Sequence, residues 1–370
     1  MNNTKKILMI SQEAPPMVGG AGVVGWQNAK RLCEVGNDVT FLTVSNEVLI
    51  DDDLEIVVSP RIPKFWLLFF IVKIHGLLKK EFDIIIINDI GAALAFSMFL
   101  NDESILRRTI VYLHGGEVKS IFKKTNILFK GFCFKSRYTK LLKGCKAIIA
   151  VSCYMKNYFL ESTRIDGISE KIKVIYAGVD GYIFKPIEYD IYEQYNIDRN
   201  RKILLSVSRI TKDKGYDAKF NVFKKLIQNN NEFHWIVVGG GGYLGELKEL
   251  SRANNLDDFI TFLGPLERKN LPVLYSSADV FWLLSNQEAF GLAYIEAQMC
   301  GTPAIGLNNS GVVESISNNV SGFLVEDEDE CFNILSNKSF ERISFEAVIN
   351  FAKIFFLENQ IVNLMNLIKK

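Results

Sequence analysis

Short β-branched runs alternate with longer segments of helical period along the whole chain, and this alternation constrains the fold more than any other feature. The pattern is typical of βαβ units, in which helices join parallel strands. It predicts two series of strands, the first opening with "KKILMIS" and the second with "RKILLSVS". The predicted strands are 6–11, 38–44, 83–88, 109–114 and 146–151, then 203–208, 234–239, 259–263, 279–284 and 303–307.

The chain has 370 residues, which is too long for one ordinary core and fits two domains. We therefore expect an α/β protein with two doubly wound sheets. Turn residues in the stretch 171–186 place the boundary near residue 180. The first domain is predicted to span 1–180 and the second 181–342. The segment 343–370 is apolar nearly all round, so we expect it to pack back on the first domain as a helix.

Composition excludes several classes of protein. Hydrophobic content of 48% and charged content of 23% are average for a globular chain, and a net charge of +1 gives no reason to expect nucleic acid. The six cysteines include no C-x-x-C pair, which argues against a thiolate metal site. The densest apolar segment, 65–78, contains Lys73 and His75 and is shorter than the ~20 residues that span a bilayer. We expect a cytoplasmic protein.

Two loops that follow predicted strands carry glycines or cations. Gly19, Gly20 and Gly22 stand ahead of a helical run, where glycine lets the backbone approach a phosphate and a helix start offers free N–H groups. A closely packed turn explains the same glycines. Arg209 directly follows a strand and Lys214 comes five residues later, which would suit a diphosphate clamp. Two solvated loop cations are the alternative.

The stretch "NQEAFGLAYIEAQMCGTPAIG" places Glu288 ahead of a helix that is predicted to begin near Gly291, and Glu296 inside that helix. Ser285-x-x-Glu288 also matches a capping box, which would explain Glu288 without a ligand. Glu296 lies among apolar neighbours, where an unpaired carboxylate is costly, so a ligand partner is attractive for it. The backbone N–H groups expected at the helix mouth, where an anion would bind, belong to Phe290, Gly291 and Leu292.

The histidines differ in context. His114 ends a predicted strand and leads into "HGGE", so we favour a role in the site. His75 and His234 have no such context, and we interpret them as packing or surface residues.

Together these residues resemble the retaining glycosyltransferases of the GT-B fold, in the group known as group 1 or family 4. The resemblance covers almost the whole chain. It includes "PPMVGGAG", "LHGGE", "VIYAGVDGYIF" and "SRITKDKG". The most specific motif is "EAFGLAYIEAQMCGTPAIG", which is similar to the E-x7-E signature of the family with its trailing G-x-P.

The resemblance implies two Rossmann-like domains that face a central cleft, and a role for each matching residue. Gly19 and Gly20 would approach the donor diphosphate, and Arg209 and Lys214 would neutralise it. His114 would lie near the transferred sugar. Glu288 would contact sugar hydroxyls, Glu296 would hold the ribose, and the backbone of 290–292 would meet the phosphate.

The reaction implied is transfer of a sugar from a nucleoside-diphosphate sugar to a hydroxyl of a glycan or a lipid-linked acceptor, with retention and without a metal. No cofactor is expected. The resemblance points to bacterial surface polysaccharides such as lipopolysaccharide, O-antigen, capsule or exopolysaccharide. A non-hydrolysing nucleotide-sugar epimerase of the same fold and a non-catalytic nucleotide-sugar-binding protein are the alternatives.

The segment 119–146 contains nine Lys or Arg and no acidic residue. Interleaved Phe, Ile and Leu make it a candidate for peripheral contact with an anionic membrane at the inner face of the plasma membrane. A solvated basic helix face is the alternative.

Overall fold

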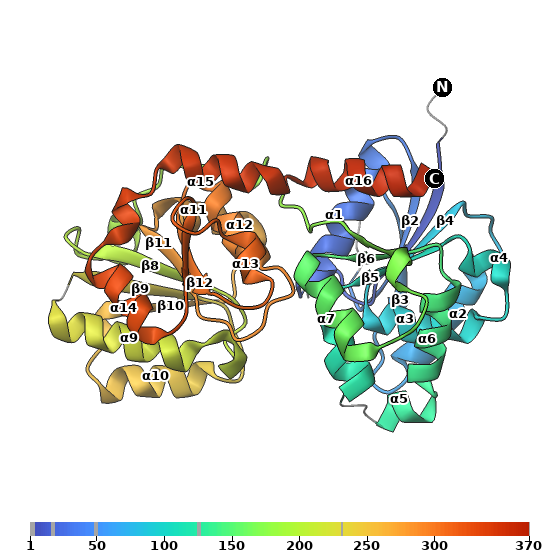
Figure 1. Ribbon diagram of the computed structural model, residues 1–370, viewed down its shortest axis with the longest axis horizontal. Helices are drawn as coiled ribbons and strands as arrows, with labels where there is room; N and C mark the ends of the chain where they lie inside the picture. The colour runs from blue at the N-terminus through green and yellow to red at the C-terminus, as the bar shows by residue number, and fades with distance from the viewer. Residues whose placement is uncertain (1–3, 16–18, 48–50, 124–126, 231, 370) are drawn as a thin grey trace. The chain divides into compact units, whose positions relative to one another are not determined.

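The computed structural model describes residues 4–15, 19–47, 51–123, 127–230 and 232–369. Contacts between residues divide the chain into two compact units. Unit 1 consists of Met1–Gly178 and Leu357–Lys370, and unit 2 consists of Val179–Phe356. Figure 1 colours both units by residue number.

Unit 1 is built on a parallel sheet that has seven strands within the described residues, in the order β3-β2-β1-β4-β5-β6-β7. The order reverses direction between β1 and β4. The buried strand β4 has the sequence Ile-Ile-Ile-Ile, as expected for a strand covered on both faces. The strands are β1 (Lys6–Ile10), β2 (Asp38–Ser45), β3 (Glu55–Pro60), β4 (Ile84–Ile87), β5 (Thr109–Leu113), β6 (Ala147–Ala150) and β7 (Ile172–Val174).

Three helices of unit 1, α3, α4 and α7, begin at residues whose side chains accept hydrogen bonds from the first turn. Asp89 accepts from the Ala92 N–H at 2.8 Å, and Ser152 accepts from the Met155 N–H at 2.9 Å. The α-helices are α1 (Gly20–Glu34), α2 (Trp66–Leu77), α3 (Ile90–Phe96), α4 (Glu103–Leu106), α5 (Ile127–Gly131), α6 (Phe134–Gly144), α7 (Cys153–Thr163) and α16 (Leu357–Lys369). Unit 1 also contains the 3-10 turns η1 (Ser97–Phe99) and η3 (Ser169–Lys171) and the π-helix η2 (Val118–Lys123).

Unit 2 repeats the same topology with six parallel strands among its described residues, in the order β10-β9-β8-β11-β12-β13. Here the order reverses between β8 and β11. Trp235 and Trp282 are fully buried at the centre of the core, with ring centroids 5.2 Å apart. The strands are β8 (Lys202–Val207), β9 (Phe233–Val238), β10 (Ile260–Gly264), β11 (Val280–Leu283), β12 (Ala304–Leu307) and β13 (Gly322–Val325).

The helices of unit 2 connect these strands. They are α8 (Ile191–Tyr195), α9 (Tyr216–Asn229), α10 (Leu244–Ala253), α11 (Leu271–Ser277), α12 (Leu292–Met299), α13 (Val312–Ser315), α14 (Glu328–Ser336) and α15 (Phe345–Ala352). Shorter turns are η4 (Lys212–Lys214), η5 (Asp257–Phe259), η6 (Arg268–Asn270), η7 (Ser339–Arg342) and η8 (Lys353–Phe355).

The segment expected to form one helix over 343–370 is divided between the two units, so that expectation was wrong. α15 belongs to unit 2 and packs on α12, and the chain leaves helical geometry at Phe356. Only α16 joins unit 1, where it packs on α1. The Gln360 side-chain oxygen accepts the Gly178 N–H at 2.6 Å. The second unit therefore ends at Phe356 and not at residue 342.

Every strand predicted from the sequence is present, with its ends within one residue of the predicted ones. Three further strands, β3, β7 and β13, were not predicted. All three lie at an edge of their sheet. Two doubly wound parallel sheets, as predicted, therefore form the framework of the molecule.

Candidate active site

The loops at the carboxyl ends of β8 and β11 carry most of the predicted site residues of unit 2. In doubly wound sheets, ligands bind beyond the carboxyl ends of the strands, where the strand order reverses. β8 and β11 are the neighbours at that reversal. The loop after β8 contains Arg209 and Lys214, and the loop after β11 contains Glu288.

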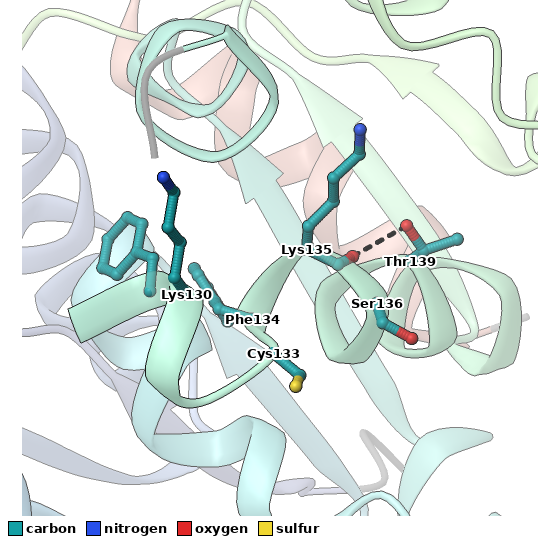
Figure 2. A pocket seen from close by; sticks show the side chains of 7 residues that line it. Lys130, Cys133, Phe134, Lys135, Ser136 and Thr139 are labelled. Carbon is teal, nitrogen blue, oxygen red and sulfur yellow. Dashed lines mark hydrogen bonds between the residues drawn. The ribbon is translucent and has the colours of Figure 1, made fainter. Parts of the chain in front are cut away.

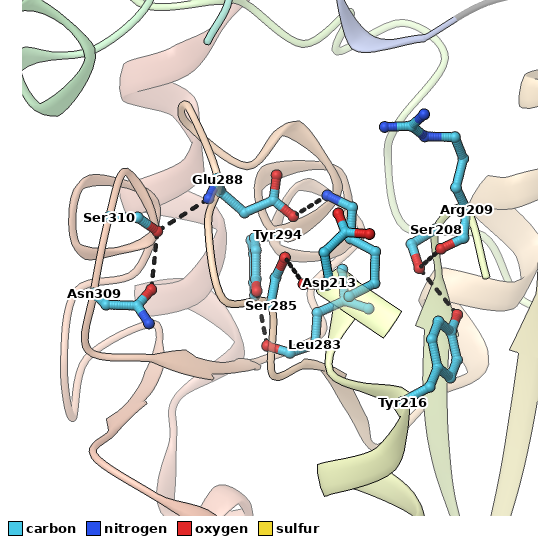
Figure 3. A network of polar contacts seen from close by, with 11 residues as sticks. Ser208, Arg209, Asp213, Tyr216, Leu283, Ser285, Glu288, Tyr294, Asn309 and Ser310 are labelled. Atoms are coloured by element: carbon cyan, nitrogen blue, oxygen red, sulfur yellow. Dashed lines mark hydrogen bonds and ion pairs between the residues drawn. The ribbon is translucent and has the colours of Figure 1, made fainter. Parts of the chain in front are cut away.

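Lys214 and Glu288, 74 positions apart in sequence, form an ion pair at this point. The Lys214 Nζ lies 2.6 Å from the Glu288 Oε1, and the two side chains are only 14% and 16% exposed. The Asp213 carbonyl oxygen accepts the Asn286 N–H at 3.0 Å. It also accepts the Ser285 hydroxyl at 3.3 Å (Figure 3). The two loops are thus joined by hydrogen bonds to a backbone carbonyl as well as by the ion pair.

Gly215 permits this close approach. Its φ is +66°, and a Cβ at this position would come within 1.8 Å of the Leu284 carbonyl oxygen. No residue with a side chain fits there without moving the backbone of the loop after β11. The glycine after Lys214 therefore sets the distance between the two loops.

Glu288 does not cap a helix, so the capping-box alternative is excluded. α12 begins at Leu292, and its N-cap is Gly291 with a φ of +105°. The Ser285 hydroxyl donates to the Asp213 carbonyl instead. Ser310, from the loop after β12, accepts the Glu288 N–H at 3.1 Å (Figure 3). The Glu288 carboxylate is left to its pairing with the lysine.

The mouth of α12 offers backbone donors. The N–H groups of Gly291 and Leu292 donate no hydrogen bond to any residue that the structure describes. The first turn of α12 contains no acidic residue that would compete for an anion. The Phe290 ring packs 5.1 Å from the ring of Phe355 and so fixes the loop that precedes the helix.

Glu296 is buried, at 7% exposure, but it has partners within the protein. The Arg268 Nε donates to its Oε1 at 3.2 Å, and the Tyr275 hydroxyl donates to its Oε2 at 3.1 Å. The Arg268 guanidinium also lies 4.7 Å from the ring centroid of Phe184. The sequence argument treated this carboxylate as unpaired, whereas the structure gives it two partners within the protein.

Arg209 differs from the other cation of the clamp. It is exposed, and its guanidinium makes no hydrogen bond or ion pair with any described residue. Its side chain extends away from the hydrogen bond that joins Ser208 and Tyr216, 2.9 Å between oxygens (Figure 3). Its charge is available to an anionic ligand.

In unit 1, Gly19 and Gly20 form the start of α1. Gly19 is the N-cap, and its N–H donates to the Glu13 Oε2 at 2.9 Å. A Cβ on Gly20 would meet nothing within 4 Å, whereas one on Gly19 would come 2.8 Å from that carboxylate oxygen. Residues 16–18 of the glycine-rich motif lie outside the described residues. In this structure, the Glu13 carboxylate accepts a hydrogen bond at the helix start where a phosphate was predicted to bind.

His114 follows β5 and faces the end of β4. Its Nε2 lies 3.2 Å from the Asn88 Oδ1, and its ring stacks on Tyr112 with centroids 5.5 Å apart. Burial lowers the pKa of His114 to about 4, so the imidazole is neutral near pH 7. The Glu117 carboxylate accepts the backbone N–H groups of His114 and Gly115 at 2.9 and 2.7 Å, which fixes the loop.

Of the other two histidines, His75 is exposed and His234 is buried, as expected for surface or packing residues. The His75 ring stacks on Phe99 with centroids 5.9 Å apart. The His234 Nε2 lies 2.8 Å from the Thr261 hydroxyl, and burial lowers the pKa of His234 to about 4.

Sequence reasoning missed Asp89, which ties the loop after β1 to the end of β4 at the strand reversal of unit 1. Its Oδ2 accepts the Ser11 hydroxyl at 2.8 Å and the Gln12 N–H at 2.6 Å. Burial raises the pKa of Asp89. The polar pair Asn88-Asp89 directly after four isoleucines marked this position in the sequence. Arg268, Tyr275 and Ser310 were also missed, and nothing local in the sequence distinguishes them.

Two family models match the chain on either side of the unit boundary. The model described as "Glycosyltransferase Family 4" matches residues 18–181, and the one described as "Glycosyl transferases group 1" matches residues 189–332. Together they cover well over half of the chain. The chain belongs to the group 1 glycosyltransferases. It is therefore an enzyme of the glycosyltransferase type.

Individual proteins similar to this glycosyltransferase agree with that assignment. The N-acetyl-alpha-D-glucosaminyl L-malate synthase of Bacillus anthracis is 24% identical over 84% of this chain and 81% of its own. Anabaena HepE, solved with UDP and glucose, superposes with a TM-score of 0.81 at 20% identity over 99% of both chains. A lipopolysaccharide outer core galactosyltransferase, WaaB, superposes with a TM-score of 0.68 at 16% identity over 98% of this chain and 99% of its own. The two structural likenesses confirm the GT-B fold of this glycosyltransferase.

Proposed function

We propose that this glycosyltransferase transfers a hexose-type sugar, with retention and without a metal ion, from a nucleoside-diphosphate sugar to a hydroxyl of a glycan or lipid-linked acceptor. The observation that carries the proposal is the Lys214–Glu288 pair at the strand reversal of unit 2, beside the free N–H groups of α12. Solved relatives of the fold hold UDP together with a sugar, which supports the donor class.

The cations of the β8 loop stabilise the departing nucleoside diphosphate in this proposal. When the glycosidic bond to phosphate breaks, negative charge grows on the diphosphate, and fixed positive charge lowers the barrier. Lys214 has three N–H donors and the described structure uses one of them for Glu288, so two remain for phosphate oxygens. Arg209 adds a second charge, and the N–H groups of Gly291 and Leu292 add backbone donors.

Unit 1 contributes neutral and backbone groups. His114, uncharged near pH 7, would offer a hydrogen bond to a hydroxyl of the transferred sugar. Gly19 and Gly20 would bring backbone N–H groups to the diphosphate, with the donor's phosphate taking the place of the Glu13 carboxylate at the Gly19 N–H. The acceptor hydroxyl attacks on the face from which the diphosphate departs, and the departing phosphate oxygen takes its proton.

Glu296 is proposed to hold the ribose through oxygen lone pairs that Arg268 and Tyr275 leave open. A carboxylate offers about four acceptor positions, and these two residues account for three hydrogen bonds. The internal partners would then orient the carboxylate for the ribose instead of competing with it.

A ligand panel tests the donor proposal directly. Nucleoside diphosphates and nucleotide sugars are added to the protein with and without EDTA, and the melting temperature is measured. A ligand present at 100 times its Kd is expected to add about 2.7 kcal/mol to the free energy of unfolding. One nucleotide series should raise the melting temperature equally in EDTA. No shift with any nucleotide would reject the donor proposal, and a shift abolished by EDTA would reject metal independence.

The proposed contact between Glu296 and the ribose is tested by comparing a nucleotide with its deoxyribose form. If the carboxylate holds the ribose, the deoxyribose form of the best nucleotide should bind the wild type about tenfold more weakly. The same pair of nucleotides should bind Glu296→Gln with nearly equal affinity. An unchanged ratio in the variant would restrict Glu296 to its structural contacts with Arg268 and Tyr275.

The acceptor is proposed to be a lipid-linked sugar of a bacterial surface polysaccharide, at the inner face of the plasma membrane. The basic segment 119–146 supports this proposal: its described part exposes Lys135, Arg137, Lys140 and Lys143 on α6. Residues 124–126 of the segment lie outside the described residues. Binding to anionic vesicles that weakens as salt is added is the expected result. Binding that is absent or indifferent to salt would count against it.

A further inference from the structure

Helix α2 of unit 1 has an apolar face on each side. Leu67, Phe70, Ile74 and Leu77 are buried against the unit. On the opposite side, the exposed fractions are 57% for Phe65, 57% for Leu68, 37% for Phe69 and 59% for Val72. These four residues, spaced i, i+3, i+4 and i+7, lie on one face of the helix. We call them the α2 patch.

The α2 patch is unusual for a surface helix. A helix on a soluble protein normally presents polar residues on the face that leaves the core. Single exposed apolar residues need no explanation, but a contiguous group of large ones marks an interaction site. The buried face already accounts for the packing of α2 on α3 and β3, so packing leaves the second apolar face unexplained.

Positive charge surrounds the α2 patch. Residues 61–80 contain five Lys or Arg and no Asp or Glu. Arg61 and Lys64 precede the helix and Lys79 and Lys80 follow it, while Lys73 is exposed next to Val72. The Lys80 Nζ lies 3.4 Å from the Glu55 Oε1, a pair in which both side chains are at least half exposed. Such a pair contributes little and leaves the rim basic.

Helix α2, which carries the α2 patch, lies near the basic helix α6. The short turn η1 connects them: the His75 ring of α2 stacks on Phe99, and the Arg137 guanidinium of α6 donates to the Ser97 carbonyl at 3.2 Å. α3 packs on both α2 and α6. Two features far apart in sequence, the apolar segment 65–78 and the basic segment 119–146, therefore flank one turn of the chain.

A shallow pocket between α5 and α6 repeats this chemistry. Phe129 and Phe134 contribute apolar lining, and Lys130 and Lys135 add two cations to it. Figure 2 shows the two lysine side chains extending in the same direction from their helices. Apolar groups with a cationic rim thus occur on α2 and again on the α5–α6 side of unit 1.

We propose that the α2 patch inserts into the interface of an anionic lipid bilayer, with the flanking basic residues on the lipid head groups. A helix with an apolar face and basic residues around it lies in the plane of the interface. At 12 residues α2 is about 18 Å long. Within the described residues, no helix is long and apolar enough to cross a membrane. α2 therefore lies on the bilayer without spanning it.

The charge around the α2 patch favours a membrane over a second copy of this chain as its partner. A symmetric dimer through the α2 patch would place the five cations of 61–80 against the same five cations of its partner. No acidic residue in 61–80 would offset that repulsion. An anionic lipid surface satisfies both the apolar patch and its basic rim.

The full-length protein is tested with vesicles of phosphatidylcholine, with and without phosphatidylglycerol, by flotation. Wild-type protein is expected to float with the anionic vesicles. Val72→Glu should lower its partition coefficient at least about tenfold, because an exposed valine that enters the lipid is replaced by an anion. Since Val72 is exposed, the variant should keep the wild-type melting temperature and its affinity for the nucleotide donor.

Val362→Glu is the matched control. Val362 is also 59% exposed and lies on α16 of the same unit, outside the α2 patch. It should float like the wild type. Equal flotation of Val72→Glu and wild type, or equal loss in both variants, would overturn the proposal.

Trp66, at the start of α2, provides an independent fluorescence measurement of whether α2 enters the lipid. Its fluorescence should be quenched by brominated lipids in anionic vesicles, and Trp66→Phe should remove that quenching while the protein still floats. A wild-type dimer in solution that Val72→Glu separates, without flotation of either protein, would assign the patch to a second copy and overturn the proposal.

Discussion

At the scale of residues, Glu288 and Glu296 show how one amino acid type serves two purposes within a single motif. Glu288 is paired with a lysine whose remaining donors are open. Glu296 is held on one oxygen by Arg268 and on the other by Tyr275. The sequence predicted both positions but not these partners, because Lys214 and Arg268 come from other loops. Spacing along the chain carries no information about such pairs.

Lys214→Ala is expected to lower kcat by about 10² or more, because it removes one fixed positive charge from the departing diphosphate. Lys212→Ala is the matched control in the same loop, since Lys212 is exposed and pairs with Glu246 at 3.3 Å. Steady-state kinetics with the identified donor measure both. Turnover of Lys214→Ala equal to that of Lys212→Ala would remove Lys214 from the mechanism.

His234 should make stability depend on pH. Burial, with help from Arg201, lowers its pKa from 6.5 to about 4, so the unfolded chain binds a proton more readily than the folded one. The stability that the neutral, buried His234 adds is therefore fully present above about pH 6.5. It is lost as the pH falls toward 4, which lowers the free energy of unfolding by about 3 kcal/mol. Urea unfolding of wild type and His234→Gln across this range should show the stability difference shrinking. A stability difference between the two proteins that does not change with pH would contradict the lowered pKa of His234.

At the scale of elements, the three strands missed from sequence all lie at the edge of a sheet, and β10 is the edge strand that was predicted. Central strands such as β1 and β4 are buried on both faces, so they appear as continuous apolar runs. The edge strand β3 is buried at one residue of six, and β7 at one of three. Such strands have little hydrophobic pattern for a sequence-based prediction to use.

Gly215→Ala should destabilise the protein and weaken nucleotide binding. The new Cβ would collide with the Leu284 carbonyl oxygen, and the backbone would be strained at a φ of +66°, so we expect a loss of about 2 kcal/mol or more. Gly245→Ala in α10 is the control, because a Cβ there meets nothing within 4 Å. That variant should be more stable by about 0.5–1 kcal/mol. Equal stability of both variants in thermal unfolding would refute the steric argument.

At the scale of the whole molecule, the sequence predicted two doubly wound units and the first crossing between them near residue 180, close to the observed Gly178–Val179. The sequence placed the return of the chain to the first unit after residue 342, whereas it occurs after Phe356. The segment was interpreted from sequence as apolar nearly all round, but α15 and α16 are each amphipathic in the structure. Only the turn η8 and Phe356 separate them, so their hydrophobic periods alone do not reveal that they pack on different units.

Gln360 should stabilise unit 1 from α16. It is 3% exposed and accepts the Gly178 N–H, so Gln360→Ala would leave a buried donor unpaired, at a cost of about 1–3 kcal/mol. Asn363→Ala, at an exposed position of the same helix, is expected to change little. Hydrogen exchange should rise in peptides of unit 1 for Gln360→Ala and not in those of unit 2. A uniform rise in both units would contradict this assignment.

The place of α16 in the chain has a consequence for biosynthesis. Unit 1 needs a helix that the ribosome makes only after the 178 residues of unit 2. At bacterial to eukaryotic rates of ~5–20 residues per second, that delay lasts roughly 9–36 s. During that time the first-made unit exposes the surface against which Leu357, Ile361, Leu364 and Ile368 will be buried. The nascent chain is therefore expected to complete its second unit first, and to depend on chaperones that cover the unfinished first one.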